Sequence, residues 1–208
     1  MRKLLIILTL FCILMNSFSL AQSECRMLFF DEFNDNSYNW PIKEYEKKAS
    51  YSMENGYYYI ECFQKRKASM ALHIIEIDEN ENFEIEASIQ KESTAKRNEY
   101  GIILGFSDIE NFYGFVINDK GEFRFFETRD GERESIFPWT ESEYIRRGIG
   151  TSNKLMIIKE GEDLKLYAND SILTVTPFQS FYGNLSGLYV QRKQRIAVDY
   201  FRILYSKK

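Results

Sequence analysis

The chain has 208 residues, 28% of them charged and 44% hydrophobic, and its formal net charge at pH 7 is −4. This acidic balance argues against nucleic acid as a partner, because nucleic-acid-binding proteins gain affinity by neutralising phosphates with Lys and Arg. The short basic runs at 146–147 and 191–195 are typical of solvated hairpin ends.

The first 21 residues have the pattern of a cleaved secretory signal. Arg2 and Lys3 precede an apolar run over 4–15, and small residues then lead up to Ala21. The run is too short for a membrane span, which needs about 20 residues. We therefore predict cleavage near Ala21, no membrane-spanning segment, and a secreted, periplasmic or cell-surface location. Residues 22–208 are predicted to form a single β-sandwich domain.

Short strands separated by turns dominate the chain from residue 27 onward. The strands are rich in Ile, Val, Tyr and Phe, and the breaks carry Gly, Asn or Asp. The predicted strands are 27–33, 56–63, 69–77, 82–91, 100–107, 112–118, 122–128, 154–159, 164–168, 172–176, 185–191 and 196–205. About a dozen strands without alternating helices predict an all-β fold, a two-sheet antiparallel sandwich.

The connections between strands carry their own signals. Residues 118–121 read Asn-Asp-Lys-Gly, a tight-turn sequence, because Gly and Asn tolerate the positive φ that a hairpin turn needs. Further hairpin turns are predicted at 159–163 and 168–171. Single helical turns are predicted at 44–49 and 142–147.

Two cysteines, Cys25 and Cys62, remain once Cys12 leaves with the signal. An oxidising compartment favours a disulfide between them. The sequence cannot place their Cα atoms within bridging distance, so the pairing stays open. Together with the single histidine, His73, they are too few for an ordinary four-ligand zinc site. His73 alternates with apolar neighbours in a predicted strand, so we expect it to be a partly buried structural residue.

Several segments carry a family resemblance when they are taken in order. They are FDEF at 30–33 with Trp40, FEIEASI at 83–89, YGIILGF at 100–106, NFYGFVI at 111–117, NKL at 153–155, LYAND at 166–170, GLYV at 187–190 and VDYFRI at 198–203. This series resembles the concanavalin A-like lectin/glucanase superfamily, including laminin G-like jelly rolls and bacterial 3-keto-disaccharide hydrolase-like domains. The resemblance implies a jelly-roll sandwich. It does not imply one activity, because the superfamily includes lectins, carbohydrate-binding modules, hydrolases and adhesion domains.

The stretch from Glu76 to Glu81 raises the alternative of a glycosidase. In the glycosidases of this superfamily three acids alternate along one strand, which brings the two working carboxyls about 5 Å apart on one face. Glu76 and Asp78 alternate in this way, but Glu81 stands three residues further on and would need a bulge to rejoin them. We therefore predict a polar turn and no catalytic residue, with Glu76 and Asp78 as the alternative catalytic pair.

Aromatic side chains make up 16% of the chain and supply the candidate ligand-binding site. Sugars are recognised by aromatic faces that cover their C–H patches and by polar groups that bond their hydroxyls. The candidate residues are Tyr57, Tyr59, Tyr113, Arg124, Trp139 and Tyr144. The alternative for each ring is packing within or beside the core. Segment 112–118 is apolar on both faces, which predicts a central strand that is covered on both sides.

Two acids share a strand face with apolar residues: Asp31 lies between Phe29 and Phe33 in the first predicted strand, and Asp199 shares its face with Phe201 and Ile203 in the last. A buried carboxylate must be paired, hydrogen-bonded or metal-bound, because burying it alone costs several kcal/mol. In many carbohydrate-binding sandwiches such acids hold a structural calcium ion, and oxygen ligands suit calcium. The alternative is that these carboxylates accept hydrogen bonds from loop backbone. No motif requires a cofactor.

These observations favour a secreted, non-catalytic recognition domain that binds extracellular or cell-surface glycan. Two alternatives remain open: a glycoside hydrolase acting on a saccharide, and a structural or adhesion domain whose partner is a protein.

Overall fold

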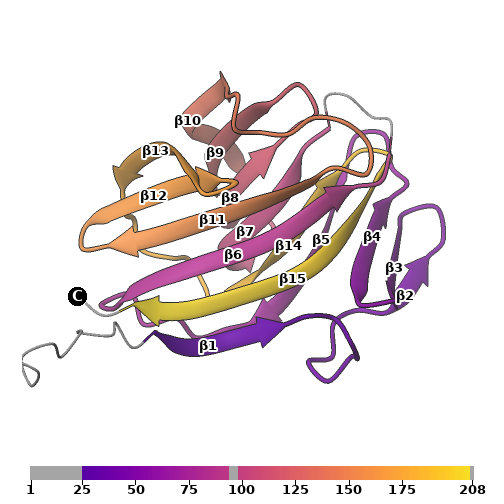
Figure 1. Ribbon diagram of the computed structural model, residues 1–208, viewed down its shortest axis with the longest axis horizontal. Helices are drawn as coiled ribbons and strands as arrows, with labels where there is room; N and C mark the ends of the chain where they lie inside the picture. The colour runs from indigo at the N-terminus through magenta and orange to yellow at the C-terminus, as the bar shows by residue number, and fades with distance from the viewer. Residues whose placement is uncertain (1–24, 94–97, 207–208) are drawn as a thin grey trace, which may run out of the picture.

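The computed structural model describes residues 25–93 and 98–206, and in this part of the chain there are strands and no helix (Figure 1). The first strands are β1 (Arg26–Asp31), β2 (Lys43–Tyr45), β3 (Ala49–Glu54), β4 (Tyr57–Cys62) and β5 (Ala68–Ile74). They are followed by β6 (Asn82–Lys91), β7 (Tyr100–Asp108), β8 (Asn111–Ile117), β9 (Glu122–Arg129) and β10 (Glu132–Glu141). The last are β11 (Ser152–Glu160), β12 (Asp163–Ala168), β13 (Ser171–Pro177), β14 (Leu185–Gln191) and β15 (Gln194–Ser206).

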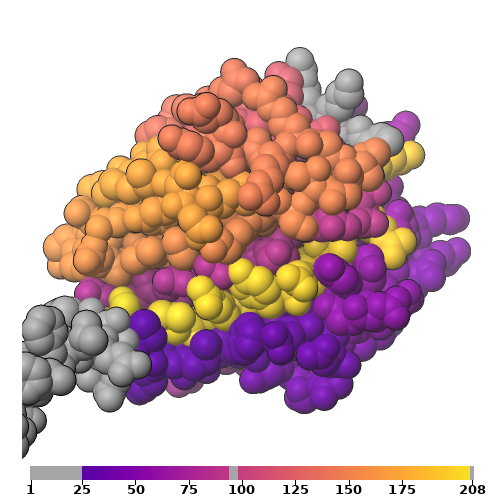
Figure 2. Space-filling view, in the orientation of Figure 1, coloured from indigo at the N-terminus to yellow at the C-terminus, as the bar shows by residue number. Residues whose placement is uncertain are grey.

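The strands form two antiparallel sheets, which confirms the predicted jelly-roll sandwich. The large sheet has the order β13-β12-β11-β6-β15-β4-β3-β2, and β1 pairs with β15 beside β4. The small sheet has the order β10-β9-β8-β7-β14-β5. In Figure 2 the N-terminal strands lie directly against the C-terminal strand β15, which shows that the two ends of the described chain meet in one sheet. β2 and β5 end their sheets on the same side of the sandwich.

Alternation along the strands builds the core between the two sheets. Phe83, Ile85, Ala87 and Ile89 of β6 are fully buried and face the small sheet. Tyr113, Phe115 and Ile117 of β8 approach them from the other side. This packing of inward-facing side chains is what the alternating sequence pattern predicts.

The predicted turns form as expected. In the turn between β8 and β9, Gly121 has φ +79° and its N–H donates to the carbonyl of Asn118 over 3.1 Å. Asn169 and Asp170, between β12 and β13, both have positive φ. The positive φ values of these residues match the tolerance that identified the turns in the sequence.

Three strands, β2, β3 and β10, were not predicted, one predicted strand is too long, and two predicted helical turns do not form. Residues 44–49 and 142–147 contain no helix; the first segment instead contains part of the β2–β3 hairpin. β10 was missed because it is mostly exposed and contains Pro138, which an edge strand tolerates because an edge N–H needs no ladder partner. The strand predicted at 69–77 ends at Ile74, and a loop follows it.

The disulfide left open by the sequence does not form. Cys25 and Cys62 are both free thiols, one exposed and the other buried. Cys25 precedes Arg26, which pairs with Tyr205, whereas Cys62 pairs with Gln194 at the other end of β15. Eleven strand residues separate these two points, or about 35 Å at the usual rise per residue. A disulfide requires Cα atoms less than about 7 Å apart.

The predicted secretory signal lies outside the described residues. Within residues 25–93 and 98–206 no helix is long and apolar enough to cross a membrane.

Candidate functional site

The outer face of the small sheet carries a second apolar cluster, separate from the main core. Ile103, Phe112, Val116, Phe126 and Tyr189 form it, and each is almost completely buried. β8 therefore has apolar side chains on both faces, as the sequence of 112–118 predicts. Gly114 lies between Phe112 and Val116, and a Cβ added there would lie 2.3 Å from Cζ of Phe126. The ring of Phe126 occupies the space that a side chain at Gly114 would fill.

Arg133 of β10 covers part of this cluster. Its guanidinium carbon lies 4.1 Å from the centre of the Phe126 ring and 5.9 Å from the centres of the Phe112 and Tyr189 rings. Such stacking of a cation on rings is favourable by about 0.5–2 kcal/mol. The nearest carboxylate, Glu99, lies 4.0 Å away and is held more closely by Arg124, at 3.0 Å.

A groove of about 550 Å³ opens next to Arg133 on the outer face of the small sheet. Met70, Leu72, Phe112 and Tyr189 form its apolar floor. Its volume is within the range of small-molecule sites, roughly 300–1,000 Å³. The floor comes from three strands of the small sheet, β5, β8 and β14.

The rim of the groove comes from other parts of the chain. Tyr45 and Lys48 belong to the β2–β3 hairpin of the large sheet, and Arg66 and Lys67 to the β4–β5 connection. Arg133 completes the rim. We call this site the basic groove, because these four cations line it and no Asp or Glu does.

The β2–β3 hairpin is held against the small sheet by a tyrosine. The hydroxyl of Tyr51 donates to the carbonyl of Met70 over 3.2 Å. Tyr45 packs edge-on against Tyr51, with ring centres 6.0 Å apart, and 43% of Tyr45 stays exposed. The basic groove therefore has an aromatic ring on its rim that no other side chain covers completely.

Two residues that line the groove each carry a buried polar atom without a protein partner in the described part of the chain. The hydroxyl oxygen of Thr128 and the side-chain oxygen of Gln191 are buried and make no hydrogen bond to any described residue. Leaving such a group unpaired costs about 1–3 kcal/mol. A ligand hydroxyl or a water molecule that reached these atoms would supply the missing partners.

The basic groove contains none of the six ligand-binding residues predicted from the sequence. Arg124 and Trp139 do meet on the same sheet face, where the guanidinium carbon lies 5.0 Å from the indole centre. Burial lowers the pKa of Arg124 below its usual value. Tyr144 is exposed in the loop after β10.

The other three predicted residues lie elsewhere. Tyr57 and Tyr59 project from β4 opposite the buried Tyr58, and Arg195 lies over the Tyr59 ring at 4.4 Å. Tyr113 is a core residue, 4% exposed, whose hydroxyl donates to Glu127 over 3.1 Å. The six residues therefore do not line one common groove.

The two predicted calcium ligands differ in burial and partners. Asp31 is buried, and its carboxylate accepts hydrogen bonds from the backbone N–H of Phe33 at 2.7 Å and from Nε1 of Trp40 at 2.8 Å. Asp199 is exposed, because the register of β15 shifts between Val198 and Tyr200 and turns it out of the core face. Within the described part of the chain, no group of three or more His, Cys, Asp and Glu side chains could hold a metal ion.

The acidic stretch after β5 is a loop. Glu76 and Asp78 are exposed, and Asp78 accepts hydrogen bonds from the backbone and side chain of Asn80. These bonds lower the pKa of Asp78 below its usual value. Such a carboxylate is ionised at neutral pH and caps a turn. The catalytic alternative built on Glu76 and Asp78 gains no support from this geometry.

His73 packs against aromatic rings beside this loop. Its ring centre lies 5.0 Å from that of Phe29 and 5.7 Å from that of Trp40. Both ring nitrogens lie within hydrogen-bonding distance of backbone carbonyls, those of Tyr38 and Ile74. His73 occupies the structural setting that its alternation with apolar residues predicts.

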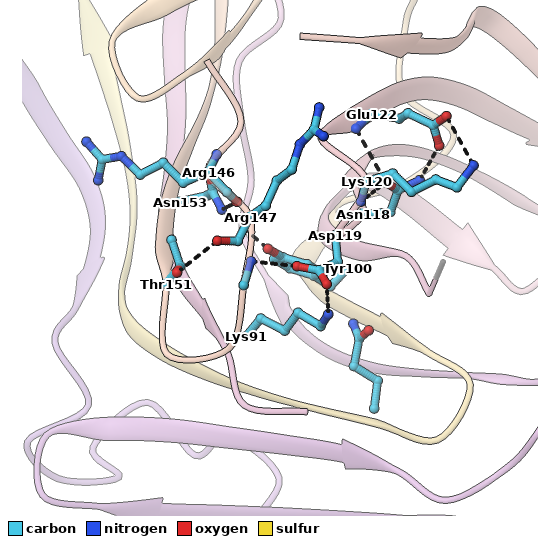
Figure 3. A network of polar contacts seen from close by, with 12 residues as sticks. Lys91, Tyr100, Asn118, Asp119, Lys120, Glu122, Arg146, Arg147, Thr151 and Asn153 are labelled. Atoms are coloured by element: carbon cyan, nitrogen blue, oxygen red, sulfur yellow. Dashed lines mark hydrogen bonds and ion pairs between the residues drawn. The ribbon is translucent and has the colours of Figure 1, made fainter. Parts of the chain in front are cut away.

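A second hollow, at the turn between β8 and β9, differs from the basic groove in its charges. Figure 3 shows the polar network around it. The ion pairs are Lys91–Asp119, Lys120–Glu122 and Arg147–Glu141. The N–H of Gly148 also donates to Asp119 over 2.7 Å. Here each of these cations has a carboxylate partner, so the network serves to hold the loop of Arg147 against the turn.

One sequence signal for the basic groove was overlooked. Residues 65–67 are three consecutive cations, Lys-Arg-Lys, between two strands. No comparable run of cations marks Tyr45 and Lys48 in the sequence. Their segment was predicted as a helical turn and not as part of a hairpin.

Comparison with known proteins shows which solved structures have a similar fold. No protein-family model matches the sequence, and no curated protein matches it. The chain is similar to the solved structure of the GH43 BlXynB protein from Bacillus licheniformis, with a TM-score of 0.62, 12% identity, and coverage of 84% of this chain and 39% of that one. It thus spans well under half of that protein's length.

Smaller proteins match over nearly their whole length. The CBM2 module of the evolved Dit of Lactobacillus casei BL23 phage J-1 has a TM-score of 0.59 and 13% identity, and covers 90% of this chain and 99% of that one. The carbohydrate binding module CBM66 from Bacillus subtilis has a TM-score of 0.50 and 15% identity, with coverage of 83% and 93%. The chain shares a two-sheet β-sandwich fold with these proteins. At these identities the likeness concerns the fold alone.

Proposed function

We propose that the chain is an exported, non-catalytic domain that recognises an extracellular carbohydrate, and that the carbohydrate binds in the basic groove. One observation carries this proposal: an exposed ring, Tyr45, shares an open groove with two buried polar atoms that lack partners, on Thr128 and Gln191. A sugar ring offers C–H patches to the tyrosine and hydroxyls to the two polar atoms.

Two further points support the proposal. Sandwiches of similar fold include one described as a carbohydrate binding module and one described as a CBM2 module. The pattern of residues 1–21 is that of a secretory signal, which would bring the domain to extracellular glycans.

The test compares two tyrosines of nearly equal exposure. Tyr45 is 43% exposed on the rim of the groove, and Tyr144 is 45% exposed in the loop after β10. The purified mature protein is applied to a glycan array and to insoluble polysaccharides, and the affinity for the best binder is measured for the wild type, Tyr45→Ala and Tyr144→Ala. We expect Tyr45→Ala to weaken binding about three- to tenfold, the value of one aromatic contact, and Tyr144→Ala to leave it unchanged.

Two results would contradict the proposal. If the folded protein bound no saccharide on either support, carbohydrate recognition would be rejected. If Tyr144→Ala rather than Tyr45→Ala weakened binding, the site would lie near the residues predicted from the sequence and not in the basic groove. Melting temperatures of both variants check that each remains folded.

A further inference from the structure

The cations of the basic groove are not neutralised by the protein. Lys48, Arg66 and Lys67 are exposed on the rim, and none of them forms an ion pair with any described residue. Arg133 has only Glu99, at 4.0 Å, which it shares with Arg124. This concentration of positive charge occurs in a chain whose net charge is −4.

Carboxylates near the groove do not compensate it. Glu99 is buried and bonded to Arg124. Glu110 lies beside Gly131 at the edge of the groove but forms no ion pair with the four described cations. Four cations around one opening repel each other, and this repulsion is relieved when a negatively charged group enters between them. Arginine side chains also present paired N–H donors that match the two oxygens of a carboxylate or sulfate.

We infer that the saccharide bound in the basic groove is acidic, carrying uronate carboxylates or sulfate esters. This inference rests on the proposed function and adds the charge of the ligand to it. Arg66, Lys67, Lys48 and Arg133 bind the anionic groups, while Thr128 and Gln191 bind hydroxyls and Tyr45 covers a ring face. A neutral saccharide would leave Lys48, Arg66 and Lys67 without an ionic partner among the described residues.

The first experiment compares pairs of saccharides with the same backbone, one member carrying anionic groups and the other neutral. Polygalacturonate is compared with its fully methyl-esterified form, and dextran sulfate with dextran, by calorimetry or affinity electrophoresis on the mature wild-type protein. We expect the charged member of at least one pair to bind about tenfold or more tightly than its neutral partner, since a charged hydrogen bond contributes more than a neutral one. The pair that shows the difference distinguishes carboxylate from sulfate.

Salt provides the second readout. Raising NaCl from about 0.05 M to about 0.5 M shortens the Debye length several-fold and should weaken binding of the charged form markedly. Equal, salt-independent binding of charged and neutral partners would overturn this inference and leave carbohydrate recognition intact. Binding of no saccharide would overturn the proposed function itself. Binding to vesicles of anionic lipid, with none to acidic saccharides, would also overturn the inference.

A matched pair of variants locates the charges. Arg66 lines the groove, whereas its neighbour Lys65 is also exposed and does not line it. Arg66→Gln should weaken binding of the charged saccharide about tenfold, and Lys65→Gln less than about twofold. Neither substitution removes a packed side chain, so both variants should fold. An equal loss in the two variants would mean that diffuse surface charge, and not the groove, attracts the ligand, and would overturn the assignment.

Discussion

The guanidinium of Arg133 lies 4.1 Å above the centre of the Phe126 ring, and Phe126 itself lies against the backbone of Gly114. Three consecutive layers, backbone, ring and cation, thus support one side of the basic groove. The position of Arg133 on the rim therefore depends on Gly114 in the middle of β8, because Gly114 leaves room for the Phe126 ring beneath the guanidinium.

Replacing Gly114 by Ala should therefore disturb both stability and binding. The new Cβ would meet the Phe126 ring at 2.3 Å, and overpacking of this kind typically costs about 1–3 kcal/mol. Urea denaturation measures the change in the free energy of unfolding. The double variant Gly114→Ala/Phe126→Leu should recover part of the loss, because leucine lacks the atoms that clash. Additive losses in the double variant would show that the ring is not the source of the strain.

Asp31→Ala should be strongly destabilising. The substitution leaves the N–H of Phe33 and the indole N–H of Trp40 buried without an acceptor, at a cost of about 2–4 kcal/mol. Asp35→Ala serves as the control, because Asp35 is exposed and accepts the N–H of Ser37 at the surface, so its loss should cost much less than the loss of Asp31. Thermal unfolding of both variants gives the comparison.

The same measurement tests the calcium hypothesis. Since both carboxylate oxygens of Asp31 already accept hydrogen bonds, we expect EDTA and added Ca²⁺ to leave the melting temperature of the wild type unchanged. A rise of several degrees on adding Ca²⁺, abolished by Asp31→Asn, would establish the calcium site instead.

The two thiols should react independently. In the folded protein iodoacetamide should modify Cys25, which is exposed, and leave Cys62, which is 1% exposed, unmodified until denaturant is added. A reducing agent should not alter the unfolding midpoint. Mass spectrometry of the non-reduced protein showing an internal Cys25–Cys62 link would contradict the strand register of β15.

Glu127 should make stability depend on pH. Burial raises the pKa of Glu127, but hydrogen bonds from Tyr182, Arg129 and Tyr113 outweigh burial and place the pKa below its usual value. An acid with a lowered pKa in the folded state stabilises the fold above its unfolded pKa, and this stabilisation is lost as the pH falls through the folded value.

Glu127→Gln removes this titration. At about pH 7 we expect the variant to be less stable by about 1–3 kcal/mol, because its amide accepts hydrogen bonds more weakly than a carboxylate. Toward about pH 3 the difference between the two proteins should shrink. Urea unfolding at both pH values measures it, and a difference that grew on acidification would contradict the lowered pKa.

The sequence predicted the sandwich because its core strands alternate strictly, as 83–89 in β6 shows. It did not predict β10, whose exposed side chains alternate weakly and whose proline is tolerated at the sheet edge. Asp199 was misplaced by a bulge, which a regular alternation cannot reveal. The basic groove was missed for a different reason: Tyr45, Arg66 and Arg133 are far apart in the sequence and meet only because two sheets end on one side.

The pairing of β15 has a consequence for how the molecule is made. This last described strand holds β6 on one side and both β1 and β4 on the other, so the large sheet stays divided until β15 arrives. Most of the pairings that close it join residues distant in sequence, which makes such topologies slow to fold. The two parts of the large sheet therefore stay unjoined until β15 pairs with both of them.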